Sequence, residues 1–144
     1  MRRAPEGSGA VTLMQDGTLQ VTGTGQRDTF QFDHFTGSQG ESVLVAVNGP
    51  PQFFPLDSVH SIDVSGGAGD DTIIVDKALA VPARVDGGEG DDVISGGAGD
   101  DVLAGGAGAD AVIGHAGTNQ LFGHDATNPD DAGDLLNDEP TYGT

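Results

Sequence analysis

A phrase of nine residues repeats without a gap in the second half of this chain. From Gly87 to Ile113 the sequence reads GGEGDDVIS, GGAGDDVLA and GGAGADAVI. Every copy places three glycines and then an aspartate ahead of a branched aliphatic residue. A period of nine is too short for a pair of packed helices and is typical of short strands joined by tight turns. The repeat therefore predicts a stacked β-structure.

The register of the repeat covers most of the second half. Consecutive phrases begin nine residues apart, at Gly87, Gly96, Gly105 and Gly114. An earlier phrase begins at Gly66, and its distance of 21 residues from Gly87 equals nine plus twelve. Residues 75–86 are therefore predicted to be one rung with three extra residues and a lost turn motif. A sixth phrase at Gly123 is degenerate, and the sequence after it follows no register.

Glycine and aliphatic residues have separate roles in the phrase. Glycine is used where the backbone needs a positive φ or where a Cβ would block close approach, so the glycines predict a tight turn with inward carbonyls. One aliphatic residue stands at the eighth position of each phrase: Ile73, Val85, Ile94, Leu103, Val112 and Leu121. One inward side chain per nine residues suits a narrow coil of parallel strands with two phrases per full turn.

The first half is predicted to be all-β as well. Short alternating runs (VTLM, LQV, FQF, VLVAV, FFPL and SIDV) predict strands with one buried face. Asp16-Gly17 and Asn48-Gly49 predict hairpin turns. We expect a flexible tail over residues 1–8, a β-rich N-terminal cap or degenerate rungs over 9–65, the repeat region over 66–125, and a C-terminal cap or loose tail over 126–144.

Composition limits the partners of the chain. Twenty-three acidic residues against five basic ones give a formal charge of −18, which argues against nucleic acid and anionic membranes and favours cations. Such a charge is also typical of disordered chains, but disorder does not explain a strict period. No apolar run approaches the roughly 20 residues of a membrane span. There is no cysteine, and hence no disulfide.

A cation explains why the acidic phrase repeats. Stacked turns place aspartate over aspartate, and two such charges at about 4 Å repel by a few kcal/mol at an effective dielectric constant near 20. A divalent cation between the turns converts this repulsion into coordination. Carboxylates, several carbonyls and a flexible glycine turn favour Ca²⁺ over Mg²⁺, which prefers a rigid octahedron and its own waters.

These residues carry a family resemblance. GGEGDDVIS and GGAGDDVLA match G-G-x-G-x-D-x-U-x at every specified position. Over about residues 66–122 the chain resembles the RTX (hemolysin-type calcium-binding repeat) family, which implies a right-handed parallel β-roll, a form of β-solenoid, with several Ca²⁺ ions in its turns. The first half looks like the irregular β-rich lead-in found before such repeats. The resemblance also implies a structural module that folds on binding calcium outside the cell, commonly after export in an unfolded state such as by type I secretion.

The resemblance implies a ligand set. A lower turn contributes its second and fourth carbonyls and its aspartate, and the turn two phrases above contributes its first and third carbonyls and its aspartate. The first implied site contains Gly88, Gly90 and Asp92 with Gly105, Ala107 and Asp110. The second contains Gly67, Gly69 and Asp71 with Gly87, Glu89 and Asp92. The third, on the opposite face, contains Gly97, Gly99 and Asp101 with Gly114, Ala116 and Asn119. Weaker binding is expected there, because an asparagine replaces the aspartate. A fourth, from Gly106, Gly108 and Asp110 to Gly123, Asp125 and Asn128, departs furthest from the pattern.

Other interpretations are kept beside this one. No G-x-S-x-G, H-E-x-x-H or P-loop motif is present, so the chain is not expected to be an enzyme. It could be the non-catalytic part of a larger secreted hydrolase or epimerase. It could also be a bacterial adhesin domain that presents Phe30, Phe32, Phe53 and Phe54 to a protein or glycan partner not identified by the sequence, although core packing is the favoured role of these rings.

Three smaller features are weighed as well. The start, MRRAPEGSGA, is not a Sec-type signal peptide, so the chain is exported another way, remains inside the cell or is a piece of a longer one. Residues 128–139 resemble an EF-hand loop that fails at its first and fifth positions. His115 and His124 are interpreted as substituted glycines and not as ligands of a transition metal.

Overall fold

The computed structural model describes residues 9–38, 40–123 and 135–137 of the chain. In these residues the secondary structure is strands apart from one short 3₁₀ turn, η1 (Leu56–Ser58), which confirms the all-β prediction. The strands are β1 (Ala10–Leu13), β2 (Thr18–Thr22), β3 (Thr29–Gly37), β4 (Gly40–Val47), β5 (Gln52–Pro55), β6 (Ser61–Ser65), β7 (Thr72–Val75), β8 (Ala83–Asp86), β9 (Val93–Ser95), β10 (Val102–Ala104), β11 (Ala111–Ile113), β12 (Gln120–Phe122) and β13 (Leu135–Asn137).

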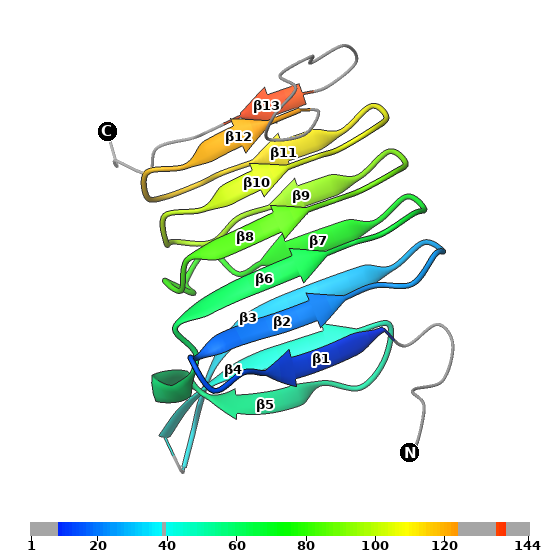
Figure 1. The fold of residues 1–144 in the computed structure, drawn as a ribbon. Helices are drawn as coiled ribbons and strands as arrows, with labels where there is room; N and C mark the ends of the chain where they lie inside the picture. The colour runs from blue at the N-terminus through cyan, green and yellow to red at the C-terminus, as the bar shows by residue number, and fades with distance from the viewer. Residues whose placement is uncertain (1–8, 39, 124–134, 138–144) are drawn as a thin grey trace.

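The strands form two facing sheets (Figure 1). One has the order β1-β2-β6-β8-β10-β12, and the other has the order β13-β11-β9-β7-β3-β4-β5. From β6 to β12 the chain alternates between the sheets, so each repeat phrase contributes one strand to one sheet. Neighbouring strands are parallel from β2 and β3 upward, whereas β1–β2, β3–β4 and β4–β5 are antiparallel. The two sheets are therefore mixed and open.

The eighth position of each phrase forms the core of the repeat half, as predicted. Val85 pairs with Leu103 in one sheet, and Ile94 pairs with Val112 in the other. The side chains of these four residues are buried, and Leu121 is partly buried against them. Because the strands are only three or four residues long, each rung adds a single aliphatic layer to the core.

The predicted strands of the first half are also confirmed. The six alternating runs correspond to β1–β6, and the turns at Asp16-Gly17 and Asn48-Gly49 join antiparallel pairs. Phe30 and Phe32 are fully buried between the sheets, and Phe54 packs partly against the core. The exception among the four phenylalanines is Phe53, which is 52% exposed and meets Phe35 edge to face.

The rung predicted to hold three extra residues is also confirmed. Residues 83–86 form β8, which pairs with β6 on one side and β10 on the other. The longer connection before it returns Leu79 to the core, where the side chain is buried. The extra residues thus lengthen one turn without changing the order of the stack.

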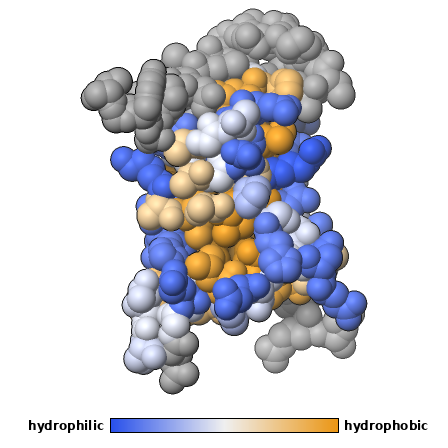
Figure 2. Space-filling model, turned by 90° about the vertical axis from the view of Figure 1, so that its left-hand side faces the viewer, coloured by the Kyte–Doolittle hydropathy of each residue, from blue (hydrophilic) through white to orange (hydrophobic). Residues whose placement is uncertain are grey.

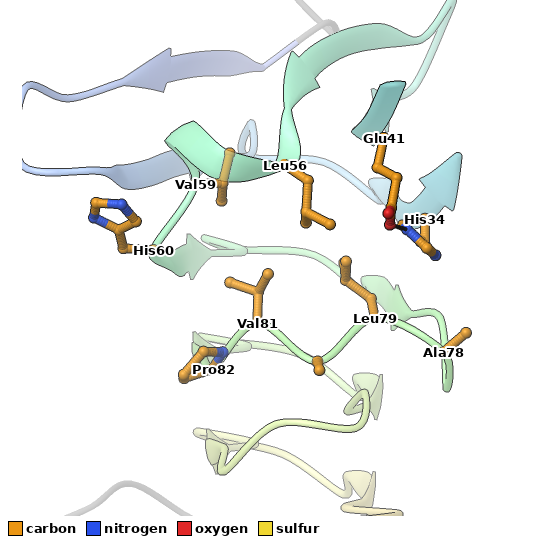
Figure 3. Close-up of a pocket in the computed structure, with 10 residues that line it drawn as sticks. His34, Glu41, Leu56, Val59, His60, Ala78, Leu79, Val81 and Pro82 are labelled. Carbon is orange, nitrogen blue, oxygen red and sulfur yellow. Dashed lines mark hydrogen bonds and ion pairs between the residues drawn. The ribbon is translucent and has the colours of Figure 1, made fainter. Parts of the chain in front are cut away.

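This longer connection borders a cleft of about 460 Å³ on one flank of the molecule, where apolar surface gathers at the centre (Figure 2). Leu56 and Val59 line one wall of the cleft, and Leu79 and Val81 line the other (Figure 3). His34 Nε2 and Glu41 Oε1 meet at one end, 2.6 Å apart, and His60 lies at the opposite end. None of the predicted calcium ligands lines this cleft.

Candidate metal centre

The turns between the strands stack in two columns at opposite edges of the sheets (Figure 1). The first column joins the six-stranded to the seven-stranded sheet and contains residues 23–28, 66–71, 87–92 and 105–110. The second column runs in the other direction and contains residues 76–82, 96–101 and 114–119. The first two implied calcium sites fall in the first column, and the third falls in the second column.

Close backbone stacking explains the glycines of the first column. Gly67, Gly69, Gly88 and Gly90 all have positive φ, between 89° and 112°. A Cβ on Gly88 would overlap the carbonyl oxygen of Gly67, and a Cβ on Gly90 would overlap that of Gly69. These positions therefore exclude any other residue for two reasons, the backbone conformation and the space.

The sixth residues of the first column form an inner ladder. Asp71 Oδ1 accepts a 2.8 Å hydrogen bond from the amide of Asp28 in the turn below. Asp92 accepts in the same way from Asp71, and Asp110 accepts from Asp92, both at 2.8 Å. All four aspartates are buried. One oxygen of each upper carboxylate is thus used to hold the turn beneath it.

The fifth residues form an outer ladder of opposite direction. Asp70 Oδ1 accepts from the amide of Asp91 above it at 2.8 Å, and Asp91 Oδ1 accepts from Ala109 at 2.9 Å. In the second column Asp100 Oδ1 accepts from Thr118 at 2.8 Å. These exposed carboxylates therefore hold the backbone of the turn above them.

The second oxygens of Asp71 and Asp92 define a candidate cation site. Both Oδ2 atoms are buried and have no hydrogen-bond partner in the structure. A Cβ built on Gly66 would lie 2.7 Å from Asp71 Oδ2 and 2.5 Å from the carbonyl oxygen of Gly87. A Cβ built on Gly87 would lie 2.5 Å from both Asp92 Oδ2 and the Gly105 carbonyl oxygen. Each first glycine thus leaves open a cradle of hard oxygen atoms from two turns, which fits Ca²⁺.

The same two carboxyl groups have perturbed acidity. Burial raises the pKa of Asp71 to about 6, with smaller contributions from the charges of Asp28 and Asp70. Burial also raises the pKa of Asp92 to about 7, and the charges of Asp110 and Asp71 add to this effect. Each carboxylate therefore favours a proton or a cation as its partner at neutral pH.

The implied carbonyl ligands of the first column already link the turns. The Glu89 amide donates to the Gly67 carbonyl at 3.1 Å, and the Ala107 amide donates to the Gly88 carbonyl at 2.9 Å. The Gly90 amide donates back to Ala107 at 3.1 Å. The structure thus brings the members of the first two implied sites together as adjacent, bonded turns. A carbonyl oxygen has two lone pairs, so one such bond leaves capacity for a cation.

The second column differs in its lower turn. Asp101 Oδ2 accepts from the amide of Gly97 at 3.1 Å, and Asp101 Oδ1 accepts from Ala83 at 2.9 Å. Gly97 and Gly99 do not have the positive φ of their counterparts in the first column. The turn beneath them is the longer connection, so the stacking geometry of the first column is not reproduced.

The upper turn of the second column uses an amide group in place of a carboxylate. Asn119 Nδ2 donates to the carbonyl oxygens of His115 at 3.2 Å and Ala116 at 3.1 Å. His115 has a positive φ of 64° where the four preceding phrases have glycine, and its ring nitrogen Nε2 lies 3.0 Å from Ser95 Oγ. Protein hydrogen bonds therefore engage part of the third implied ligand set.

The structure adds a turn that the sequence analysis missed. Residues 23–28, GTGQRD, stack beneath residues 66–71 and place Asp28 at the sixth position of the first column. A glycine followed five residues later by an aspartate, ahead of an alternating strand, was the available signal. Only the first of the three usual glycine positions is occupied by glycine in this turn, so its spacing alone does not identify it as a repeat.

Some expectations fall outside the described residues. The fourth implied site depends on Asp125 and Asn128, which lie outside the described residues. His124 and most of the EF-hand-like segment, residues 128–139, lie outside them as well. Within residues 9–38 and 40–123, no three His, Cys, Asp or Glu side chains are close enough to hold a metal ion together. Over the same stretches, no helix has the length and apolar character to cross a membrane.

Comparison with known proteins agrees with the repeat register. Residues 63–76 and 85–124 match the RTX calcium-binding nonapeptide repeat in four copies. Residues 1–62 and 77–84, which include most of the longer connection, lie outside this match. No curated protein and no solved structure matches the chain.

Proposed function

We propose, from the premise that this chain carries RTX calcium-binding nonapeptide repeats, that it is a structural module whose repeat half folds on binding Ca²⁺. The supporting observation is the pair of buried Oδ2 atoms on Asp71 and Asp92, which have no hydrogen bond and lie beside a carbonyl oxygen of the next turn. Bound Ca²⁺ supplies the positive charge that these stacked oxygens lack. The completed fold is a right-handed parallel β-roll.

The proposed ligands are the seventeen residues of the three implied sites, and the first column is the stronger one. Asp92 belongs to both of its sites, below Asp110 and above Asp71, so its carboxylate couples three turns. The second column binds more weakly, because Gly97 and Ala83 already donate to Asp101. Several ions are expected in total.

The chemistry of the cradle supports Ca²⁺ over Mg²⁺. Its donors are carboxylate and carbonyl oxygens on turns whose glycines have positive φ, such as Gly88 and Gly90. Ca²⁺ accepts six to eight oxygen ligands in variable geometry, whereas Mg²⁺ requires a compact octahedron and retains water. Modest affinity suffices outside cells, where Ca²⁺ is abundant.

The thin core supports folding coupled to binding. Each nonapeptide buries one aliphatic side chain, such as Ile94 or Leu103, which stabilises by roughly 1.5–3 kcal/mol. Ordering the backbone of one residue costs about 1–2 kcal/mol, and each phrase orders nine. Charged Asp71 and Asp92 add repulsion. Without a cation the repeats therefore lack a sufficient driving force.

The proposal includes a place of action and a role. The module is non-catalytic and acts outside the cell, and it crosses the membranes of its source in an unfolded, calcium-poor state by type I secretion. Support comes from the family, whose members are typically structural and secreted in this way. The charge of −18 agrees with this route, because self-repulsion keeps a metal-free chain extended.

Circular dichroism of the full chain tests the proposal. Titration with Ca²⁺ from an EDTA-treated start should produce a cooperative gain of β-structure that Mg²⁺ at equal concentration does not reproduce. A spectrum already at its final form in EDTA, unchanged by Ca²⁺, would contradict folding on binding.

A further inference from the structure

Each turn of the first column is completed by two groups of the turn below. The amide of the seventh residue donates to the sixth carbonyl beneath it, as in Val93 to Asp71 and Ala111 to Asp92, both at 2.9 Å. The sixth amide beneath donates upward to the aspartate Oδ1, as Asp71 does to Asp92. Every turn thus needs one acceptor and one donor from below.

At the bottom of the described column, one side chain supplies both groups. The Thr29 amide donates to Asn48 Oδ1 at 2.7 Å, and Asn48 Nδ2 donates to Asp28 Oδ1 at 2.7 Å. Thr29 and Asp28 are the seventh and sixth residues of the lowest turn. The carboxamide of Asn48 therefore takes the place of the amide and the carbonyl that the sixth residue of a further turn would provide.

The backbone fixes Asn48 in this position. Its φ is 56°, in the left-handed region that asparagine adopts more readily than other non-glycine residues. The Asn48 amide also donates to the Thr29 carbonyl at 3.1 Å. The Asn48-Gly49 hairpin between β4 and β5 thus delivers the side chain beneath the lowest turn.

The remaining capacity of the lowest carboxylate is used by Thr24. Asp28 Oδ2 accepts from the Thr24 amide at 2.8 Å, and Asp28 Oδ1 accepts from Thr24 Oγ1 at 2.8 Å. With Asn48, this gives the buried Asp28 three donors. Asp92, in contrast, has an Oδ2 atom without any donor.

We propose that Asn48 replaces a missing turn and, together with Thr24, replaces the cation at the lowest turn. The N-terminal half, residues 9–65, is then an ordered seed in the absence of Ca²⁺, and the repeats are laid on it when calcium arrives. The contrast between the halves rests on the proposed calcium-dependent folding. The role of Asn48 rests on its own hydrogen bonds.

Hydrogen–deuterium exchange of the full chain, in EDTA and in Ca²⁺, tests this inference. In EDTA we expect protected amides in β2, β3 and β4 and fast exchange in β9, β10 and β11. Asn48→Gly tolerates the left-handed backbone and removes the side chain with its carboxamide, so exchange in β2 and β3 should rise about 10- to 100-fold in EDTA. Thr24→Val is the milder variant, with a smaller rise at the same amides. Asp16→Ala, which removes an exposed 3.0 Å turn bond to Thr18, is the control and should change exchange by about twofold or less.

The outcomes separate the two proposals. Wild-type amides of β2 and β3 that exchange in EDTA as fast as those of β9 would overturn the seed. An Asn48→Gly variant that exchanges like the wild type would overturn the role of the carboxamide. Protection of β9–β11 in EDTA would instead contradict calcium-dependent folding, and the Asn48→Gly comparison would still decide the role of Asn48.

Discussion

The lowest turn, in the N-terminal half, and the repeat turns stacked above it belong to one column, but their buried aspartates have different partners. Asp28 receives three protein donors from Thr24 and Asn48. Asp71 and Asp92 have the same position in their turns, yet one oxygen of each has no donor. A turn of one shape thus exists in two chemical forms, one completed by the protein and one that is open to a cation.

The two halves also differ in the core beneath their turns. In the chain segment from β2 to β6, the core includes Phe30 and Phe32 of β3, both fully buried, together with the valines of β4. In the segment from β9 to β11, each strand contributes a single residue to the core cluster, such as Ile94 or Val112. The comparison teaches that the half with the larger apolar core also satisfies its buried charge internally, whereas the half with the thin core leaves buried carboxylate oxygens without a donor.

The largest expected effect comes from filling one cradle. A Cβ on Gly87 would lie 2.5 Å from Asp92 Oδ2 and from the Gly105 carbonyl oxygen, so Gly87→Ala should abolish most of the calcium-induced gain of β-structure. The control is Gly25→Ala in the lowest turn, where a Cβ would meet nothing within 4 Å. That change should alter the free energy of unfolding by no more than about 1 kcal/mol. Circular dichroism during Ca²⁺ titration compares the two variants. A normal calcium response of Gly87→Ala would contradict the assignment of a cation site beside Gly87.

The next effect distinguishes the two columns. Asp92→Asn removes a carboxylate shared by two proposed sites and should raise the midpoint Ca²⁺ concentration about tenfold or more. Asp101→Asn should raise it less, because Gly97 and Ala83 already donate to that carboxylate. In EDTA the Asp92→Asn protein should be the more ordered one, since the buried charge is gone. Equal midpoints for the two variants would contradict the stacking register.

Much of the repeat half could be predicted because its period allows few solutions. A nine-residue spacing of aliphatic residues fixed which side chains face inward, and Ile94, Leu103 and Val112 are buried accordingly. The six alternating runs of the first half likewise became β1–β6. In both cases the information lies within a few residues of the element that it specifies.

The rest depends on contacts between distant residues. Asn48 reaches Asp28 across 20 positions, and no local pattern identifies this asparagine as more than a hairpin residue. The altered turn at Gly97 is set by the longer connection packed beneath it. In that connection the carbonyl of Leu79 accepts a 2.9 Å hydrogen bond from the amide of Ala98. The sequence revealed the three extra residues of that connection but not their effect on the next turn of the column.

A smaller effect concerns pH in the absence of metal. The pKa of Asp71 is raised to about 6 and that of Asp92 to about 7, above the ordinary value of 3.8, so the folded repeats bind more protons than the unfolded chain between those values. The resulting stabilisation is complete below about pH 4 and is lost as pH rises through 6 and 7. In EDTA the repeats should therefore gain structure between pH 8 and pH 5, and at pH 6 calcium binding should require more Ca²⁺ because it competes with protons. Circular dichroism at fixed EDTA measures the first effect, and loss of structure on acidification over this range would contradict the assigned burial.

The smallest effect tests whether the two halves are held together by surface charge. Arg27 and Asp70 form the ion pair between the lowest turn and the first repeat turn, at 3.6 Å, with 76% and 50% of their side chains exposed. Exposed pairs of this kind contribute about 0–1 kcal/mol, and salt screens them. Arg27→Ala should therefore shift the calcium midpoint by less than about threefold, and the shift should vanish at high salt. A large, salt-resistant shift would mean that the seed organises the repeats through this contact, and not through the buried amide of Asp28 that donates to Asp71.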